Sequence, residues 1–341
     1  MSSLILTCNA GSNNTKLAAF NAETLQSVDH AAVHSLDEVI AWLKTHENVV
    51  AIGHRVVHGG RAFTQPKCLS DEVVKTLTDF IPLAPLHQPA ALKIIKVARA
   101  HYSAIPHIAC FDTAFHHTIS DINRRLPLPA QYHDEGLMRY GFHGLSYQHI
   151  VDVLPEYAKD KATGRIIVAH LGGGASACAM KNLESVDSTM GFSTLEGLMM
   201  GTRCGSLDPG ALLYLLEADG MSLPALNNLL YHNAGLKGVS GMSDDMRALL
   251  SSAAPSAQEA VELYCILAAK QMAGLLPAIG GLDALVFTGG IGENAKAIRD
   301  KITARLRWLG DFPVYVIPTD EELVIAQACQ KAYNTKQATA R

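Results

Sequence analysis

The chain has 341 residues, of which 48% are hydrophobic and 18% are charged, and its formal net charge is −4. This length and apolar content suffice for a large core and indicate two domains. The weak negative charge argues against a surface that binds nucleic acid, and no window has the roughly 18 apolar residues of a membrane span.

Apolar runs typical of strands alternate with helical patterns along the chain, which predicts an α/β protein. We expect strands at residues 4–8, 16–20, 49–52, 106–110, 165–170, 176–180, 283–288 and 313–317. We expect helices at about residues 36–47, 71–79, 88–100, 146–153, 209–219, 256–278, 295–307 and 320–333. The segment 256–278 is apolar on most faces but contains charged residues, so a buried central helix explains it better than a membrane span.

Two segments share one pattern, an apolar strand, a turn of small residues and a second strand. They are "LILTCNAGSNNTKLAAF" near the start and "RIIVAHLGGGASACAM" at 165–180. A duplicated fold and two unrelated hairpins both explain this similarity. The first turn is unusual because Lys16 follows it directly, and a hairpin turn alone does not need a lysine.

In chain order, the first arginine in an apolar, glycine-containing setting is Arg55, in "GHRVVHGG". Arg203, in "MGTRCGSLDPG", and Arg247, in "GMSDDMR", have similar settings. The planar guanidinium suits a carboxylate or a phosphate. A salt bridge across a loop is the alternative. Arg139 and the pair Arg124-Arg125 are predicted to be surface cations.

Asp112 directly follows the expected strand "HIACF", where a carboxylate in an α/β protein often faces the ligand. His143 lies between an aromatic residue and a glycine in "RYGFHG", as an imidazole that lines a pocket would. Structural roles are expected for His54, His58 and His87.

Two glycine clusters follow expected strands, at 171–176 and at 287–294, and the second leads into a helix expected to begin near Ala295. Glycines allow the backbone to approach a ligand, so a nucleotide site is the natural prediction, with tight turns alone as the alternative. Neither cluster has the P-loop or the Rossmann dinucleotide pattern. Near the end of the chain, Asp320, Glu321 and Glu322 suit the first turn of a helix, and a carboxylate there could also hold Mg²⁺ through water.

The seven cysteines are dispersed, without a CxxC motif or zinc spacing, so a structural zinc site is disfavoured. Dispersed cysteines are typical of buried thiols in a reducing compartment, and the N-terminus lacks a secretory pattern. The sequence therefore predicts a soluble, cytoplasmic protein.

With these residues assembled, the sequence resembles the acetate kinase family (acetate/propionate kinases) in stretches that span nearly the whole chain. The matching stretches are "NAGSNNTK", "GHRVVHGG", "LAPLHQPAAL", "FDTAFHHTI", "RYGFHGLSYQHI", "AHLGGGAS", "STMGFSTLEGLMMGTRCGSLDPG", "GVSGMSDDMR", "LVFTGGIGEN" and "IPTDEELVIA".

The resemblance implies a duplicated α/β fold of the actin/hexokinase/Hsp70-like (ribonuclease H-like) kind, with two domains around an active-site cleft. It places an acyl- and phosphate-binding domain at 1–145, with a C-terminal helix of about 320–341 packed back on it, and a nucleotide-binding domain at 146–319. It also implies reversible in-line transfer of the ATP γ-phosphoryl group to acetate or a similar short carboxylate, giving acetyl phosphate and ADP. The implied cofactor is Mg²⁺, for which Mn²⁺ can substitute, and the implied assembly is a homodimer without nucleic acid or membrane.

The resemblance also assigns residues to roles. Asp112, His143 and Arg203 match the catalytic positions. Arg55 would bind the carboxylate, and Val57, Leu86 and Phe142 would form the acyl pocket. Asn9 and Glu321 match the metal-linked positions, and Ser12 matches a phosphate-binding one. The nucleotide would contact Lys16, His170, Leu171, Gly172, Gly173, Gly174, Asp245, Met246, Arg247, Gly290, Ile291, Gly292, Glu293 and Asn294.

An acyl carboxylate is already ionised at pH 7, so the reaction needs no strong general base. We therefore expect Asp112 to orient Arg55 or Arg203, or to assist the metal, rather than to accept a proton.

Four features depart from the family pattern. Asn13 and Asn14 replace serines in the first turn, Gly173 replaces an asparagine, Thr194 replaces a proline of the acyl pocket, and the chain is shorter before Gly53 and between 294 and 319. Three alternatives stay open: a kinase that prefers propionate, a weak paralogue that senses nucleotide or acyl phosphate, and a generic actin-like ATPase.

Overall fold

The computed structural model describes residues 2–11 and 14–339. Contacts divide the chain into two compact units. The first unit comprises Met1–His117, Phe142–His149 and Asp320–Arg341, and the second comprises Thr118–Gly141 and Ile150–Thr319. Helix α6 (Gly144–Ala158) begins in the first unit and continues into the second.

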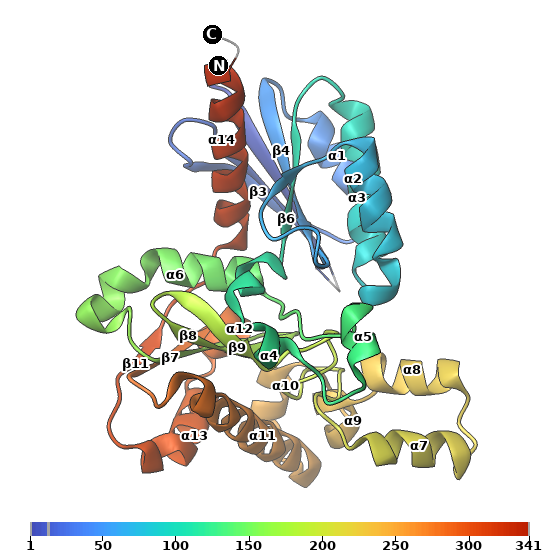
Figure 1. Cartoon of the computed structure of the whole chain (residues 1–341), viewed down its shortest axis with the longest axis vertical. Coiled ribbons are helices and arrows are strands. Elements are labelled where there is room, and N and C mark those ends of the chain that lie inside the picture. Colours follow the sequence, from blue (N-terminus) through green and yellow to red (C-terminus); the bar gives the residue numbers. More distant parts are fainter. Residues whose placement is uncertain (1, 12–13, 340–341) are drawn as a thin grey trace. The chain divides into compact units, whose positions relative to one another are not determined.

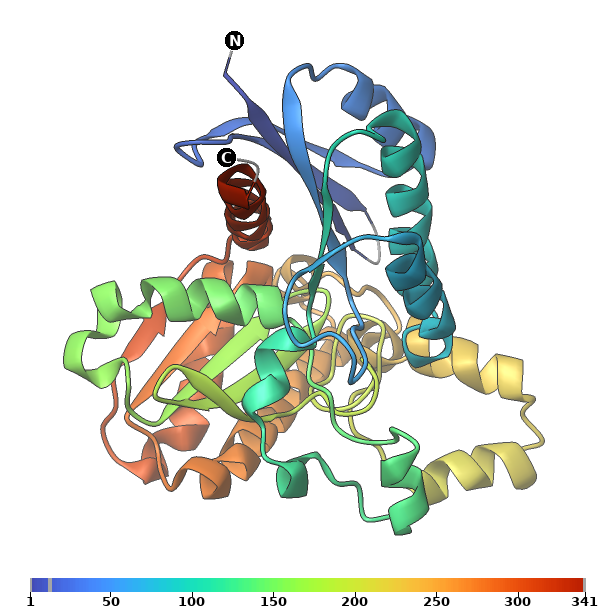
Figure 2. The same cartoon turned by 45° about the horizontal axis from the view of Figure 1, so that its top comes forward.

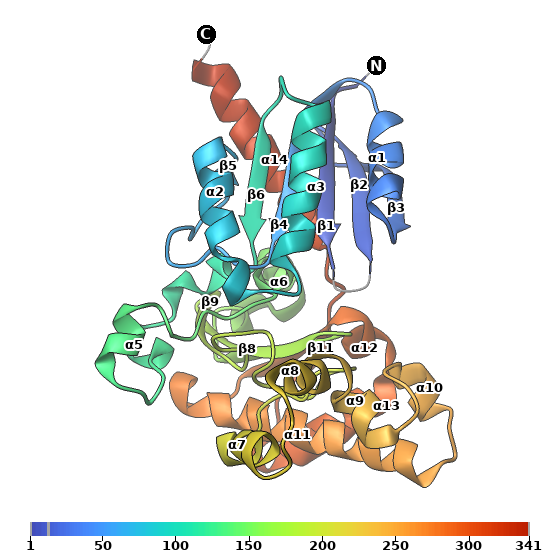
Figure 3. The same cartoon turned by 90° about the vertical axis from the view of Figure 1, so that its right-hand side faces the viewer.

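The first unit contains a six-stranded mixed sheet with the order β3-β2-β1-β4-β6-β5. Its strands are β1 (Leu4–Ala10), β2 (Thr15–Asn21), β3 (Ser27–Val33), β4 (Val49–Val56), β5 (Lys67–Cys68) and β6 (His107–Phe111). Helices α1 (Leu36–Lys44), α2 (Asp71–Asp79) and α3 (Gln88–His101) lie on one side, and α14 (Glu321–Thr339) lies on the other (Figure 1). Figure 3 shows the same sheet between α3 and α14.

The central strand β1 illustrates why the sheet is covered on both faces. Successive side chains of a strand point to opposite faces. Leu6 and Cys8 belong to the core that includes residues of α1 and α3, whereas Ile5 belongs to the core formed with α14. Each fully buried aliphatic side chain of this kind stabilises the fold by about 1.5–3 kcal/mol.

The second unit contains a five-stranded sheet with the order β11-β10-β7-β8-β9. Its strands are β7 (Ile166–Leu171), β8 (Ala175–Lys181), β9 (Glu184–Ser188), β10 (Ala284–Thr288) and β11 (Val314–Val316). Its helices are α4 (Asp121–Arg124), α5 (Ala130–Asp134), α7 (Pro209–Glu217), α8 (Leu223–His232), α9 (Gly235–Ser240), α10 (Met246–Leu250), α11 (Pro255–Ile279), α12 (Gly289–Asn294) and α13 (Lys296–Leu306).

The two sheets repeat one topology. In the first, an antiparallel meander β1-β2-β3 is extended by strands β4 and β6 parallel to β1. In the second, the meander β7-β8-β9 is extended by β10 and β11 parallel to β7. The predicted α/β class and the predicted duplication are confirmed, and β5 is an addition at the edge of the first sheet.

Helix α11 is long and apolar enough to cross a membrane by length and composition alone. In the structure it packs against β8, α9 and α13 of its own unit. Its buried side chains include Tyr264, Met272 and Leu276. It is therefore a core helix, as the sequence predicts.

Candidate functional site

The centre of the candidate site in the first unit is a buried ion pair between β4 and the end of β6. Strands β4 and β6 are parallel neighbours, so Arg55 near the end of β4 lies beside Asp112, which follows β6. The Arg55 Nε donates to both carboxylate oxygens of Asp112 at 3.1 Å, and Nη2 donates to Oδ2 at 2.6 Å. The side chain of Asp112 is 1% exposed and that of Arg55 is 11% exposed.

Burial and neighbouring charges act on this pair in opposite directions. Burial raises the pKa of Asp112, because the charged carboxylate loses its hydration, although Arg55 and the backbone N–H of His143 favour the charged form. Burial disfavours the charge of Arg55, but the carboxylates of Asp112, Glu321 and Glu322 outweigh it and raise the pKa of the guanidinium. Arg55 is therefore a permanent cation, held by the carboxylate of Asp112.

Asn9 connects this pair to the start of α14. Its Nδ2 donates to Glu321 Oε2 at 2.8 Å and to Glu322 Oε1 at 2.7 Å. Its Oδ1 accepts from Arg55 Nη1 at 3.2 Å. Carboxylates only accept and guanidinium only donates, so these partners determine the orientation of the amide.

Lys16 lies opposite Asn9 in the register of β1 and β2. Its Nζ lies 4.0 Å from Glu322 Oε1, and its side chain is 58% exposed. The ammonium is thus placed beside the carboxylates but stays open to solvent. The predicted phosphate-binding residue Ser12 lies outside the described residues.

His143 and the start of α6 pack against the backbone of Asp112. His143 has a positive φ of 56°, which is uncommon for a residue other than glycine. The next residue, Gly144, donates from its N–H to the carbonyl of Asp112 at 3.0 Å, and a Cβ on Gly144 would overlap that carbonyl. The glycine therefore permits the close approach that holds His143 beside Asp112.

The three predicted acyl-pocket residues differ in their surroundings. Phe142 is buried, with its ring centroid 5.6 Å from that of His58. Val57 is buried directly after β4, whereas Leu86 is half-buried in the turn before α3. Their joint role as a pocket stays a prediction.

In the second unit, the three predicted nucleotide-binding segments converge. The turn between β7 and β8 places the position of a Gly172 Cβ 3.9 Å from the backbone nitrogen of Gly290. Gly201 lies between this turn and the segment before α10, since its Cβ position is 3.7 Å from Gly173 O and 3.2 Å from Asp244 O. Gly173 and Gly290 have open space where a Cβ would be, as backbone that approaches a ligand requires.

The second glycine cluster contains more structure than predicted. The helix expected near Ala295 is confirmed as α13, which begins at Lys296, and residues 289–294 form an additional short helix, α12. Gly289 has φ of 77° and lies against the backbone of Leu171, which its lack of a side chain allows. Glu293 Oε1 accepts the N–H groups of Gly289 at 2.9 Å and Thr319 at 3.2 Å, so its carboxylate caps this helix from within.

The predicted pair Asp245 and Arg247 forms a local ion pair at the start of α10. Asp245 caps the helix by accepting the N–H of Arg247 at 2.9 Å, and Arg247 Nη2 donates to Asp245 Oδ2, also at 2.9 Å. These hydrogen bonds lower the pKa of Asp245. The Arg247 side chain is 89% exposed, so its predicted nucleotide contact is not preformed.

Arg203 is buried in the loop that follows β9. Its Nη1 donates to the carbonyl of Thr194 at 2.8 Å. The loop is closed by paired hydrogen bonds between Gly197 and Ser206, at 3.0 and 2.9 Å. Thr194, which stands where the family pattern has proline, is also buried.

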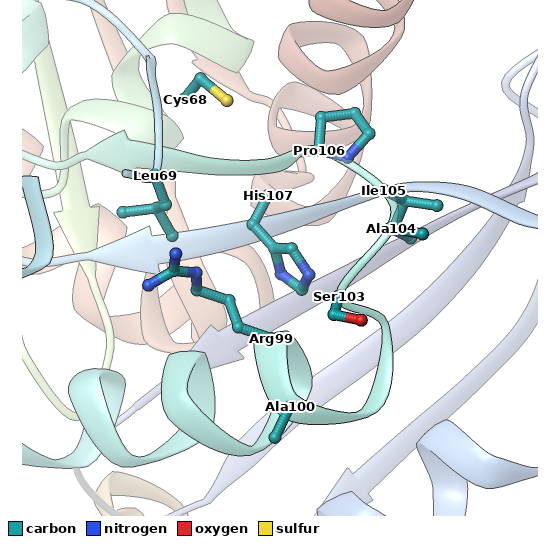
Figure 4. Close-up of a pocket in the computed structure, with 9 residues that line it drawn as sticks. All are labelled: Cys68, Leu69, Arg99, Ala100, Ser103, Ala104, Ile105, Pro106 and His107. Carbon is teal, nitrogen blue, oxygen red and sulfur yellow. The ribbon is translucent and has the colours of Figure 1, made fainter. Parts of the chain in front are cut away.

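A cavity of about 530 Å³ lies elsewhere, at the start of β6 and thus at the opposite end of that strand from Asp112 (Figure 4). Arg99 and His107 face it, with Leu69 beside them. None of the predicted site residues lines it.

Comparison with known proteins identifies the family. A model of the acetokinase family matches residues 2–312. The chain belongs to the acetokinase family. An acetate kinase of Rhodopseudomonas palustris, a member of this family, is 41% identical over 388 aligned positions, which cover 96% of this chain and 98% of the relative. The alignment is longer than the chain, so this acetokinase lacks segments that its relative has.

Two solved structures agree with the fold. A propionate kinase from Francisella tularensis matches with a TM-score of 0.89 and 32% identity, covering 96% of this chain and 99% of that one. An acetate kinase from Porphyromonas gingivalis matches with a TM-score of 0.86 and 30% identity, covering 97% and 99%. The family and the fold inferred from the sequence are confirmed.

Two groups of residues in this acetokinase escaped the sequence-based prediction of roles. Glu322 contacts both Asn9 and Lys16, whereas the predicted metal role went to its neighbour Glu321. The sequence signal that could have indicated a role for Glu322 is its position next to Glu321 in the first turn of a helix. Arg139 and Glu196 form an ion pair across 57 residues of sequence, and no local pattern indicates it.

Proposed function

We propose that this protein is an acetate kinase, which transfers the γ-phosphoryl group of ATP reversibly to acetate or a similar short carboxylate. A carboxylate oxygen of the acid bonds to the γ-phosphorus while the bond to the β–γ bridging oxygen breaks, so acetyl phosphate and ADP form. The observation that carries the proposal is the buried Arg55–Asp112 pair, tied through Asn9 to two carboxylates, in a member of the acetokinase family.

In this mechanism Arg55 binds the carboxylate of the acid and Asp112 orients Arg55. The three hydrogen bonds from Arg55 to Asp112 support an orienting role rather than proton acceptance. His143 and Arg203 neutralise charge on the equatorial oxygens of the transferring phosphoryl group, and Val57, Leu86 and Phe142 enclose the acyl chain. Charge neutralisation and in-line positioning are the main demands of phosphoryl transfer.

The nucleotide binds along His170–Gly174, Asp245–Arg247 and Gly290–Asn294, with Lys16 and Ser12 at its phosphates. The convergence of the two glycine-containing turns and the segment before α10 in the second unit supports this assignment. The segment 1–145 then serves as the acyl- and phosphate-binding domain, with the C-terminal helix, and 146–319 serves as the nucleotide-binding domain.

The donor set at the start of α14 suits magnesium. Mg²⁺ is commonly held by one or two carboxylates together with substrate phosphates. Glu321 and Glu322 converge on Asn9, and no larger cluster of metal-binding side chains occurs among residues 2–11 and 14–339. Glu321 would hold Mg²⁺, or Mn²⁺ in its place, and Asn9, whose Nδ2 donates to Glu321, would orient that carboxylate at the ion. The ion would neutralise the phosphate charge of ATP.

The protein acts as a cytoplasmic homodimer, with neither nucleic acid nor membrane as a partner. All seven cysteines are free thiols, which supports a reducing compartment. Figure 2 shows α7 and α8, in yellow, as a helical hairpin. This hairpin supports the dimer, because several of its large apolar side chains are exposed. These are Leu213, Tyr214 and Leu223, and Leu207, just before α7, is exposed as well.

A hydroxamate assay with acetate, propionate or butyrate and Mg·ATP tests the proposal. We expect acyl phosphate with at least one acid, and the ratio of kcat/KM values identifies the preferred one. Preference for propionate would assign the protein to the propionate kinases, consistent with Thr194 in place of proline. Nucleotide binding without acyl phosphate from any acid would indicate a sensor. ATP hydrolysis without an acid acceptor would indicate a generic ATPase.

A further inference from the structure

Arg139, predicted from the sequence to be a surface cation, is largely buried in the second unit. Its Nη1 donates to the carbonyl of Ser188 at 2.8 Å, and its Nη2 donates to Glu196 Oε1 at 3.1 Å. Its Nε lies 3.8 Å from Asp187 Oδ1, and its side chain is 20% exposed. A guanidinium with two hydrogen-bond acceptors and a second carboxylate nearby is typical of a structural contact rather than of a solvated surface group.

The segment that carries Arg139 also forms backbone hydrogen bonds with the loop that follows β9. The carbonyl of Gly191 accepts the N–H of Tyr140 at 2.9 Å and that of Gly141 at 3.4 Å. The carboxylate of Glu196 occupies the space that a side chain at residue 191 would need. Glycine at this position therefore allows Glu196 to reach Arg139.

This loop holds two of the residues that the proposed function connects with the reaction, Thr194 and Arg203. Thr194, two residues before Glu196, accepts a hydrogen bond through its carbonyl from Arg203 Nη1 at 2.8 Å. Gly197, directly after Glu196, is bonded to Ser206, three residues beyond Arg203. A displacement of Glu196 would therefore be transmitted to Arg203 from both directions.

We propose that Arg139 is a positioning residue that acts through Glu196 to fix the loop carrying Thr194 and Arg203. Arg139 itself touches no reacting group in this scheme. It sets where the Arg203 guanidinium lies and how Thr194 faces the acyl chain, so it affects both the rate and the choice of acid. The assignment of chemistry to Thr194 and Arg203 rests on the proposed function, whereas the ordering of the loop does not.

The kinetic test uses Arg139→Gln and Gly191→Ala. The first removes the guanidinium that binds Glu196, and the second displaces the Glu196 carboxylate from its place beside Arg139. Because small misplacements of a transition-state group are costly, we expect kcat to fall about tenfold or more in both variants. The KM for Mg·ATP should stay close to wild type, and the ratio of kcat/KM for propionate and acetate should change. Residues that act as one unit are not additive, so the combined Arg139→Gln/Glu196→Gln variant should be no slower than Arg139→Gln.

Arg165→Gln is the matched control. Arg165 forms a comparable pair with Asp283 in the same unit, with Nη2 to Oδ1 at 2.6 Å and Nε to Oδ2 at 2.9 Å, but it lies outside this loop. We expect wild-type kinetics from this control. If Arg139→Gln is folded and keeps the wild-type kcat and acid ratio, the proposal is wrong and Arg139 serves stability alone.

A second readout is independent of activity. Cys204, next to Arg203, is half-buried, and Cys68 is the other thiol of the seven that is not buried. In a Cys68→Ser background, Arg139→Gln should increase the rate of Cys204 labelling by a disulfide reagent several-fold, and Arg165→Gln should not. An unchanged labelling rate would overturn the proposed ordering of the loop. Faster labelling in a protein that forms no acyl phosphate would refute the kinase and leave the positioning intact.

Discussion

At the scale of single residues, the candidate site depends on the buried ion pair between Arg55 and Asp112. Breaking a buried pair by removing one partner leaves an uncompensated charge, which is far more costly than losing an exposed pair. Arg55 and Asp112 form a buried pair of this kind, and Arg99 with Asp71 forms an exposed one. The two pairs therefore provide a matched comparison.

We expect Asp112→Asn to lower the free energy of unfolding by about 3–5 kcal/mol, because Arg55 keeps its charge without its partner. The misplaced guanidinium should raise the KM for the acid and lower kcat/KM by about 100-fold or more. Asp71→Asn should change the stability by about 1 kcal/mol or less. Urea denaturation and steady-state kinetics measure these effects. A variant that only shifts the pH profile, with normal metal and acid affinity, would instead identify Asp112 as a base.

A buried histidine predicts how stability depends on pH. Burial lowers the pKa of His58 to about 4, and its Nδ1 accepts the N–H of Gly60 at 2.9 Å. The unfolded chain takes up this proton near pH 6.5, before the folded protein does. The stability is therefore present above pH 6.5 and is lost as the pH falls toward 4, by about 3 kcal/mol from this group.

Urea denaturation between pH 7 and 4 measures this loss. His58→Asn keeps a hydrogen-bond acceptor but does not titrate, so its pH dependence should be shallower. Some dependence should remain, because burial also lowers the pKa values of His54 and His107. An identical slope in wild type and variant would exclude His58 as a contributor.

At the scale of elements, the sequence predicts most of the strands and helices that carry a strong apolar pattern, although it misses α8. Strands β1, β2, β4, β6, β7, β8, β10 and β11 were all expected. Strands β3 and β9 were missed because they are rich in polar residues, and β5 has only two residues. Helix α12 was missed because its sequence, GGIGEN, has a low intrinsic helix propensity.

The same contrast applies to the site. Asp112 could be placed from sequence because it directly follows an apolar strand, and Lys16 because it follows a turn. The ion pair between Arg139 and Glu196 could not be predicted from the sequence, because the two residues come together only in the folded chain. Local patterns report local structure, and pairs that are distant in sequence depend on tertiary packing.

Two helical glycines test whether tertiary packing or local helix propensity determines the effect of a substitution. Gly144→Ala should be strongly destabilising and should abolish activity, because its Cβ would overlap the carbonyl of Asp112 at the start of α6. Gly274→Ala, inside α11 with open space around it, should stabilise the protein by about 0.5–1 kcal/mol. Thermal unfolding and the hydroxamate assay compare the two. A harmless Gly144→Ala would mean that α6 can shift away from Asp112.

At the scale of the whole molecule, the α7–α8 hairpin stands out because packing within its own unit does not bury the apolar residues of α7. Helix α7 has the sequence PGALLYLLE, yet none of its residues is buried. A cluster of exposed, large apolar side chains is typical of an interface. A second copy of the chain is the partner that the proposed homodimer supplies.

Leu213→Asp should therefore weaken the dimer, with a dissociation constant raised about tenfold or more, since a charge would be buried at the interface. Ile122→Asp is the control, because Ile122 is also exposed but lies in α4. Sedimentation velocity over a concentration series measures both. Wild-type assembly in Leu213→Asp would exclude this hairpin as the interface.

The return of α14 to the first sheet has a consequence for synthesis on the ribosome. Gly53 in the central strand β4 packs so tightly against Ile325 and Cys329 that it has no room for a side chain. The strands of the first sheet are synthesised before α14, so the core between them can form only after α14 has left the ribosome. The segment Ile150–Thr319 of the second unit is synthesised before α14. Pulse proteolysis of stalled nascent chains should show protection of the second unit before the first. Early protection of the first unit, with α14 still inside the exit tunnel, would contradict this order.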